Sequence, residues 1–274
     1  MTPSSIGCSG SHLSPPAEPR APHRVARHVM MGRMMDVEIW SDVVCPWCAI
    51  GKVRFERALA AFGHADEVTV RWRSFELDRH APASRDGDYA AMLAAKYRTT
   101  TDRAQAMIDR MVDQGAAEGL DFRFDIVKPG NTFDAHRVLH LAAERGLQHE
   151  VKDRFLDAYH SEGEEVGDHD VLVRLAADAG MDAEEVRAML ATDDFADAVR
   201  ADEDQAVEYG ISGVPFFVLD RRMGVSGAQP TEVLLQALEQ AWAARTEDTA
   251  SAASHADHEH AGDTCGVDGC AVAS

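Results

Sequence analysis

The 274-residue chain has little cysteine and no long apolar run. Five cysteines are too few for a small secreted scaffold held together by disulfides. No apolar stretch approaches the roughly 18 residues that a membrane-spanning helix needs, so a soluble protein without a membrane partner is expected. The N-terminal segment contains arginines, but no apolar stretch follows them as in a secretory signal, and we therefore expect a cytoplasmic protein.

Basic residues are also in short supply. The 27 Lys and Arg stand against 47 Asp and Glu, which gives a net charge of −20. A surface this acidic repels phosphate backbones, so nucleic acid is not an expected partner. Apolar residues make up 45 % of the chain, which is ordinary for a globular protein, and at this length a sizeable core can form.

The composition divides the chain into three parts. Residues 1–34 are rich in Pro, Ser, Arg and His without a hydrophobic period, and they are predicted to be a disordered N-terminal extension. Residues 246–274 are rich in Ala, Ser, Asp, His and Gly. They are predicted to be a disordered, acidic, His-containing tail that ends in a C-x4-C pair. A single folded domain is expected over residues 35–245.

Within this domain, hydrophobic periodicity predicts an α/β fold. Alternating residues predict strands at 36–42 and 68–75, with a helix between them that begins at a cysteine pair. Residues 88–210 show mainly helical periodicity. A short apolar strand at 214–220 follows, with a pairing strand at 223–228 and a final helix over Thr231–Ala244.

The first cysteine pair, Cys45 and Cys48, has three interpretations: a metal site, a structural disulfide or a working dithiol. A zinc site needs about four ligands, and the nearby His64 and His80 are irregularly spaced, so no metal is expected. A disulfide across three residues closes a tiny loop and stabilises little. A thiol at a helix N-terminus faces the positive end of the helix dipole, which predicts a lowered pKa for Cys45.

The two residues between the cysteines suit a working dithiol. Pro46 falls at an early helical position, where its missing N–H costs nothing. Trp47 offers a flat apolar surface to a substrate, although core packing explains a tryptophan equally well. Cys48 lies one turn into the helix, where it can resolve a mixed disulfide formed by Cys45.

Other chemistry-bearing residues leave alternatives open. Cys265 and Cys270 near the C-terminus could be an auxiliary dithiol that exchanges with the first pair, a metal site shared with nearby histidines, or an inert end. His136 and His140 have the spacing of a metal pair, but no glutamate completes the motif, so surface or core histidines are expected. Cys8 has no obvious mate.

Three ordered motifs carry a resemblance: SDVVCPWC, then NTFDAHRVLHLA, then GVPFFVLD followed by VSGAQP. Over about residues 35–245 the chain resembles the DsbA-like thioredoxin-fold family. It is most similar to the FrnE-type disulfide oxidoreductases, which are related to 2-hydroxychromene-2-carboxylate isomerases and kappa-class glutathione transferases. The resemblance implies a thioredoxin fold with a large helical insertion, about 88–210, between its βαβ and ββα halves.

The resemblance also implies site residues. Val214 and Pro215 would form a cis-proline loop beside the dithiol and, with Pro46 and Trp47, shape a substrate groove. Asn131 lies where the isomerase and transferase relatives line their active site, although a helix cap is the alternative. Some FrnE-type proteins are similar in having a C-terminal C-x4-C.

The function expected from residues and resemblance together is thiol–disulfide exchange through a mixed disulfide on Cys45. No cofactor is required, glutathione is a candidate redox partner, and protein or small-molecule thiols and disulfides are the expected substrates of a monomer or homodimer. One alternative is a glutathione-dependent isomerase or transferase of an aromatic small molecule, although those relatives typically carry Ser in place of Cys45. The non-enzyme alternative is a zinc-binding interaction module.

Overall fold

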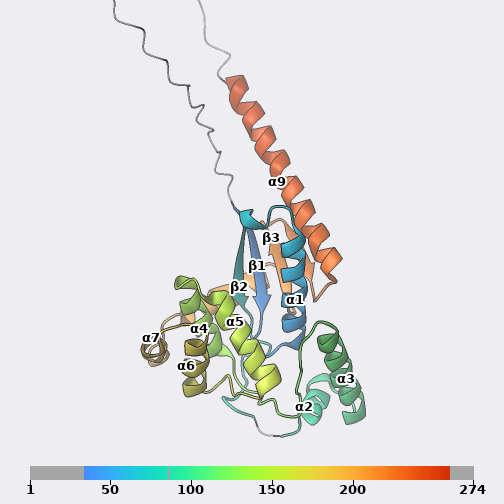
Figure 1. The fold of residues 1–274 in the computed structure, drawn as a ribbon, viewed down its shortest axis with the longest axis vertical. Coiled ribbons are helices and arrows are strands. Elements are labelled where there is room, and N and C mark those ends of the chain that lie inside the picture. The colour runs from blue at the N-terminus through green and yellow to red at the C-terminus, as the bar shows by residue number, and fades with distance from the viewer. Residues whose placement is uncertain (1–33, 86, 260–274) are drawn as a thin grey trace, which may run out of the picture. The chain divides into compact units, whose positions relative to one another are not determined.

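The computed structural model describes residues 34–85 and 87–259. A four-stranded mixed sheet with strand order β2-β1-β3-β4 forms its centre (Figure 1). The strands are β1 (Met35–Ser41), β2 (Val68–Ser74), β3 (Phe216–Leu219) and β4 (Met223–Ser226). β1 pairs in parallel with β2 and antiparallel with β3, which in turn pairs antiparallel with β4. The predicted strands and the predicted pairing of the last two are confirmed.

Both faces of the sheet are covered, which explains why β1 is buried at nearly every position. Ile39 and Phe217 pack against α1 (Pro46–Ala61) and α9 (Thr231–Glu259) on one face. Trp40 contributes to a smaller cluster on the other face, beside α8 (Ala196–Glu208). Because successive residues of a strand point to opposite faces, a strand covered on both sides also buries its polar residues, here Glu38 and Ser41.

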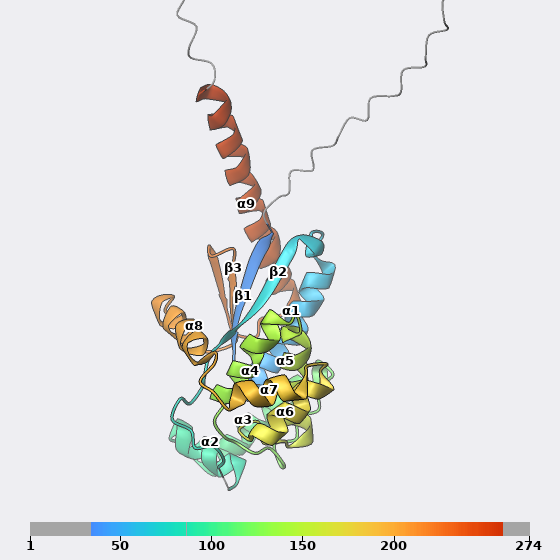
Figure 2. The same ribbon diagram turned by 90° about the vertical axis from the view of Figure 1, so that its left-hand side faces the viewer.

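The helical insertion lies between β2 and β3, as predicted. It contains α2 (Tyr89–Tyr97), α3 (Thr101–Ala117), α4 (Phe133–Glu144), α5 (Gln148–Asp157), α6 (His169–Asp178), α7 (Ala183–Leu190) and α8. A short π-helical segment, η2 (Ala158–Glu162), extends α5, and a 3-10 turn, η1 (Ala65–Glu67), precedes β2. Helices α4 to α7 surround the largest apolar cluster. Helices α2 and α3 form a separate hairpin that packs on the first turns of α1 through Ala49 and Ile50 (Figure 2).

The final helix differs from the prediction. It begins at Thr231 as expected, but it continues past Ala244 to Glu259, into the segment predicted to be a disordered tail. Alanine, the strongest helix former, is frequent in that segment, whereas the sequence argument relied on its polarity. α9 runs beside α1, and its C-terminal end points away from the end of the sheet where β1 leads into α1 (Figure 1).

No helix in the described part of the chain has the length and apolarity needed to cross a membrane. Residues 1–33, with Cys8, lie outside the described residues, as do Cys265 and Cys270.

Candidate active site

The dithiol lies where β1 passes into α1. Cys45 is the N-cap residue of α1, in extended conformation, and Pro46 takes the first helical position. The backbone N–H of Cys48 donates to the Cys45 carbonyl at 2.9 Å, which closes the first turn. Both side chains are free thiols and both are buried, Cys45 to 3 % exposure and Cys48 to 0 %. The predicted order of strand, dithiol and helix is therefore confirmed.

A loop from the far end of the chain meets the dithiol. The Cys45 thiol lies 3.7 Å from the Val214 carbonyl oxygen, and the Val214–Pro215 peptide bond is cis. Gly51 permits this approach, because a Cβ there would stand 2.8 Å from Cγ of Pro215. The loop is held on its other side by the Gly227 N–H, which donates to the Pro215 carbonyl at 2.8 Å.

A cavity of about 560 Å³ opens beside Cys45. Pro46, Trp47 and Val214 form part of its wall on the dithiol side. The α2–α3 hairpin contributes mainly apolar side chains: Tyr89, Met92, Leu93, Met107 and Met111. Cys48 does not line the cavity, so Cys45 is the thiol that a substrate can reach. Methionine is flexible and polarisable, so this wall can adapt to apolar groups of different shape.

Asn131 lies near the cavity but is used within the chain. Its Oδ1 accepts a hydrogen bond from the Phe133 N–H at 2.9 Å, at the start of α4. Its amide nitrogen lies 3.4 Å from the Ala81 carbonyl oxygen. The cavity is lined by its neighbours Gly130 and Thr132. These contacts favour the capping interpretation of Asn131.

An acidic side chain is buried immediately before the dithiol. Asp42 accepts hydrogen bonds from the Leu77 N–H at 2.8 Å and from Nε2 of His136 at 3.3 Å. Burial raises the pKa of Asp42, but His136, the Leu77 N–H and the Lys152 ammonium together outweigh burial and leave that pKa below its ordinary value. His136 is thus a core histidine that fixes Asp42, and His140 pairs with Asp202 at 3.1 Å.

The pKa values of the two thiols are shifted in opposite directions. The hydrogen bond with Cys48, together with burial, raises the pKa of Cys45 well above its ordinary value. Burial also works against the Cys48 thiolate, but the Cys45 thiol, the Lys152 ammonium and the nearby Ser41 hydroxyl outweigh it, so the pKa of Cys48 is lowered. The pair therefore loses its first proton readily and its second with difficulty.

The prediction that Cys45 has a lowered pKa was wrong, because the lowered pKa belongs to Cys48. The prediction considered only the dipole of α1 and its free N–H groups. It missed the side chains that the fold brings to each sulfur. Lys152 and Ser41 favour charge on Cys48, whereas Asp42 disfavours charge on Cys45. Cys45 remains the accessible sulfur, while the surroundings favour charge on Cys48 over charge on Cys45.

Two buried basic residues behind the dithiol were missed by sequence reasoning. Lys152 in α5 and His160 in η2 are each 1 % exposed. Neither Nζ of Lys152 nor either ring nitrogen of His160 has a hydrogen-bond partner in the described part of the chain. Burial lowers the pKa of Lys152 to about 8 and that of His160 to about 3. In sequence, both residues look like ordinary polar positions of an amphipathic helix.

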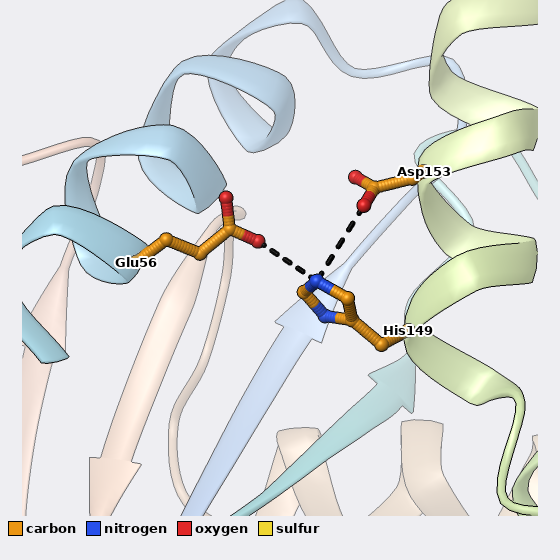
Figure 3. Close-up of side chains that lie close together, drawn as sticks. All are labelled: Glu56, His149 and Asp153. Atoms are coloured by element: carbon orange, nitrogen blue, oxygen red, sulfur yellow. Dashed lines mark ion pairs between the residues drawn. The ribbon is translucent and has the colours of Figure 1, made fainter. Parts of the chain in front are cut away.

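A group with metal-ligand chemistry lies at the surface between α1 and α5. Glu56, His149 and Asp153 bring their polar atoms within 4.8 Å of one another, with the His149 ring 3.1 Å from Glu56 (Figure 3). The ammonium of Lys52, whose side chain is 5 % exposed, pairs with both carboxylates. A cation already occupies the position between them, so we interpret the group as a charge-balanced ion-pair cluster.

A sheet of this topology with a buried dithiol at the start of α1 defines an enzyme of the thioredoxin-fold oxidoreductase class. The chain belongs to the family of DSBA-like thioredoxin domains, whose family model matches residues 36–239. The family resemblance identified from the sequence is confirmed.

Known relatives agree with this assignment. A probable DsbA oxidoreductase, SCO1869 from Streptomyces coelicolor, is 53 % identical, with 76 % of this chain and 90 % of that chain covered and a TM-score of 0.73. The uncharacterized protein YwbO of Bacillus subtilis is 30 % identical over 204 residues, or 74 % of this chain and 94 % of that protein. The cytosolic disulfide reductase DsbM of Pseudomonas aeruginosa, solved with GSH, shares the fold at 17 % identity, covering 79 % and 98 %, with a TM-score of 0.52.

Proposed function

We propose that this chain is a FrnE-type thiol–disulfide oxidoreductase that works through its C-P-W-C dithiol. The observation that carries the proposal is the placement of the two sulfurs: Cys45 faces the cavity and the Val214 carbonyl, whereas Cys48 is buried beneath it. Only one sulfur can therefore meet a substrate disulfide. The other is positioned to displace the substrate afterwards.

The reaction balances as two successive exchanges. The pair passes its single proton from Cys45 to Cys48, and the Cys45 thiolate attacks one sulfur of the substrate disulfide. A Cys45–substrate disulfide forms and one substrate thiolate leaves. Cys48 then attacks the Sγ of Cys45, so that the internal disulfide forms and the second substrate thiol is released. The reverse sequence oxidises a substrate dithiol.

The groove beside Cys45 suits an extended substrate. Pro46, Trp47 and Val214 line the dithiol side of the cavity, and the cis bond to Pro215 follows Val214. The backbone of Val214 can pair with an extended segment, as in strand addition. The substrates proposed are protein or small-molecule thiols and disulfides, and glutathione is the small thiol to test first. The reaction needs no further cofactor, and we propose a cytoplasmic setting, where a reducing pool can recycle the dithiol.

The second cysteine pair is proposed as an auxiliary dithiol. Helix α9 spans about 43 Å at 1.5 Å per residue and leads away from the dithiol. We propose that Cys265 and Cys270 exchange with the dithiol of a second molecule, since α9 leads away from the dithiol of its own chain. Mixing a Cys45→Ser/Cys48→Ser chain with a Cys265→Ser/Cys270→Ser chain tests this: exchange should be faster than with the second chain alone.

Insulin reduction and refolding of scrambled ribonuclease test the proposed function. Wild type should catalyse at least one of the two, whereas Cys45→Ser should be inactive in both because no sulfur remains at the cavity. Asn131→Ala is a matched control near the cavity and should retain exchange. Inactivity of the folded wild type in both assays, with glutathione present, would refute the proposal.

A further inference from the structure

Lys152 is held in an environment that does not suit an ammonium group. It lies on the inner face of α5, 1 % exposed, with its Nζ 5.7 Å from the centre of the Trp72 ring. Its Nζ has no hydrogen-bond partner among the residues that the structure describes. An ammonium that is buried without such partners costs several kcal/mol relative to water unless charge nearby compensates it. A methionine of similar length would fill the same space at lower cost.

The charged groups around Lys152 come from three directions. Cys48, Cys45 and Lys52 lie on α1, and Asp42 lies at the end of β1. From η2 comes the neutral imidazole of His160. Asp42 is already engaged by His136 and by the Leu77 N–H. Lys152 therefore shares the charge of Asp42 with His136, and the dithiol supplies the other negative charge that faces its ammonium.

Lys52 offers an internal comparison. It is the other buried lysine in the described part of the seam between α1 and α5, but its ammonium pairs with Glu56 and Asp153. Its charge is thus neutralised by groups that do not change during thiol–disulfide exchange. The two lysines therefore differ: part of the counter-charge of Lys152 comes from the thiols and changes during exchange, whereas the counter-charge of Lys52 does not change.

We propose that Lys152 is a positioning residue that keeps Cys48, the resolving thiol, in its thiolate form. This inference rests on the proposed function. In the resolving step Cys48 gives its proton to the substrate thiolate released in the first exchange. The Lys152 ammonium stabilises the resulting Cys48 thiolate, which attacks the Sγ of Cys45 while the Cys45–substrate bond breaks and the second substrate thiolate leaves. Lys152, which no longer faces a thiolate, then gives its own proton to the leaving thiolate or to water.

The charge of Lys152 then follows the redox state of the dithiol. Burial lowers the pKa of Lys152 to about 8 in the dithiol form, while the charges of Cys48 and Asp42 oppose that lowering. In the disulfide form the thiolate charge is gone, so the pKa of Lys152 falls further. Oxidation of the dithiol therefore releases the Lys152 proton, and reduction takes it up again.

The test follows the resolving step by itself. Full-length protein with Cys8, Cys265 and Cys270 changed to Ser is reacted with an aromatic disulfide reagent that releases a coloured thiolate. A first phase reports attack by Cys45 and a second phase reports displacement by Cys48. The second phase is recorded against pH for three proteins in this background: the parent, Lys152→Met, and Lys52→Met as the matched control.

The parent should show a second phase that stays fast below pH 7. Lys152→Met should move the midpoint of that phase upward by about 1–3 pH units, the usual effect of losing an adjacent opposite charge. Lys52→Met should leave the midpoint in place. Oxidised Lys152→Met should also unfold at a urea concentration no lower than the parent, because an uncompensated charge has been removed from the interior. A purely structural lysine would lower that concentration.

The outcomes separate the two proposals. A parent that shows no second phase contradicts the proposed function itself. A parent and Lys52→Met with a normal second phase, together with an unshifted midpoint in Lys152→Met, overturn only the role of Lys152. If Lys152→Met does not fold, Lys152→Gln removes the same charge and should show the same upward shift in the midpoint of the second phase.

Discussion

The substitution Gly51→Ala should slow thiol–disulfide exchange, because its new methyl group displaces the Val214–Pro215 loop without contacting either sulfur. The new Cβ would stand 2.8 Å from Cγ of Pro215 and 3.6 Å from the backbone of Ala228. A carbon–carbon contact prefers about 3.5–4.0 Å, so the loop must move outward by somewhat less than 1 Å. That movement carries Val214 away from Cys45.

The energy change has two opposing parts. Replacing a helical glycine by alanine stabilises the helix by about 1 kcal/mol. Overpacking of this size costs about 1–3 kcal/mol, so the free energy of unfolding should fall by about 0–2 kcal/mol. Stability alone should therefore change little. Exchange should fall about ten-fold or more, because a displacement near 1 Å can cost as much as a hundred-fold in rate.

Gly63→Ala is the matched control, because a Cβ at Gly63 meets nothing within 4 Å. Urea unfolding gives the stability of each variant and insulin reduction gives its exchange rate. Gly51→Ala should lose exchange while Gly63→Ala keeps it. If Gly51→Ala exchanges as fast as wild type and is equally stable, the close packing of α1 on the Pro215 loop does not position the substrate groove.

Three further outcomes follow from buried charges. Arg73 pairs with Glu38 and, at 2.8 Å, with Asp202, so Arg73→Met should cost about 3 kcal/mol in urea unfolding because it takes the shared cation from two buried carboxylates, leaving Asp202 with His140 and the Ser74 N–H. A loss no larger than that of Arg123→Met, whose pair is exposed, would contradict this. The pKa of Asp202 is lowered because its partners outweigh burial, so its stabilisation is present above the unfolded pKa of about 3.9 and is lost as pH falls through the lower folded value. Asp202→Asn should thus be less stable at neutral pH and show a flatter dependence on pH below about 4, and an unchanged slope there would argue against the pairing. Glu118 links α3 to Arg54 of α1 at 2.6 Å, so Glu118→Gln should loosen the α2–α3 hairpin and speed its amide hydrogen exchange, an effect that should be missing in Glu184→Gln.

The parts of the site that follow local rules could be predicted from the sequence. The strand before Cys45, the helix start at Pro46 and the glycine-punctuated helices of the insertion all depend on patterns of a few residues. The contact between Val214 and Cys45 joins segments 169 positions apart, and only the family resemblance predicted it. Periodicity alone offers no signal for such a contact.

The electrostatics of the dithiol could not be predicted, because they depend on side chains that distant helices bring together. Lys152 and His160 reach the dithiol from the helical insertion, and nothing in their local sequence distinguishes them from solvent-facing residues. The hydrogen bond between the two thiols, together with Lys152 beside Cys48, reverses the expected order of the two thiol pKa values. The continuation of α9 past Ala244 was missed for a different reason: polar composition predicts exposure to water, and exposure is compatible with a helix as well as with a coil.

Trapping of the mixed disulfide tests the central claim most directly. Full-length Cys48→Ser and Cys45→Ser, each with Cys8, Cys265 and Cys270 changed to Ser, are incubated with a disulfide substrate and analysed by peptide mass spectrometry. Cys48→Ser should accumulate the substrate adduct on Cys45, because the attacking sulfur remains at the cavity and the resolving sulfur is gone. Cys45→Ser should accumulate none. An adduct on Cys48 of Cys45→Ser, formed as fast as that on Cys45 of Cys48→Ser, would contradict the assignment of the two sulfurs.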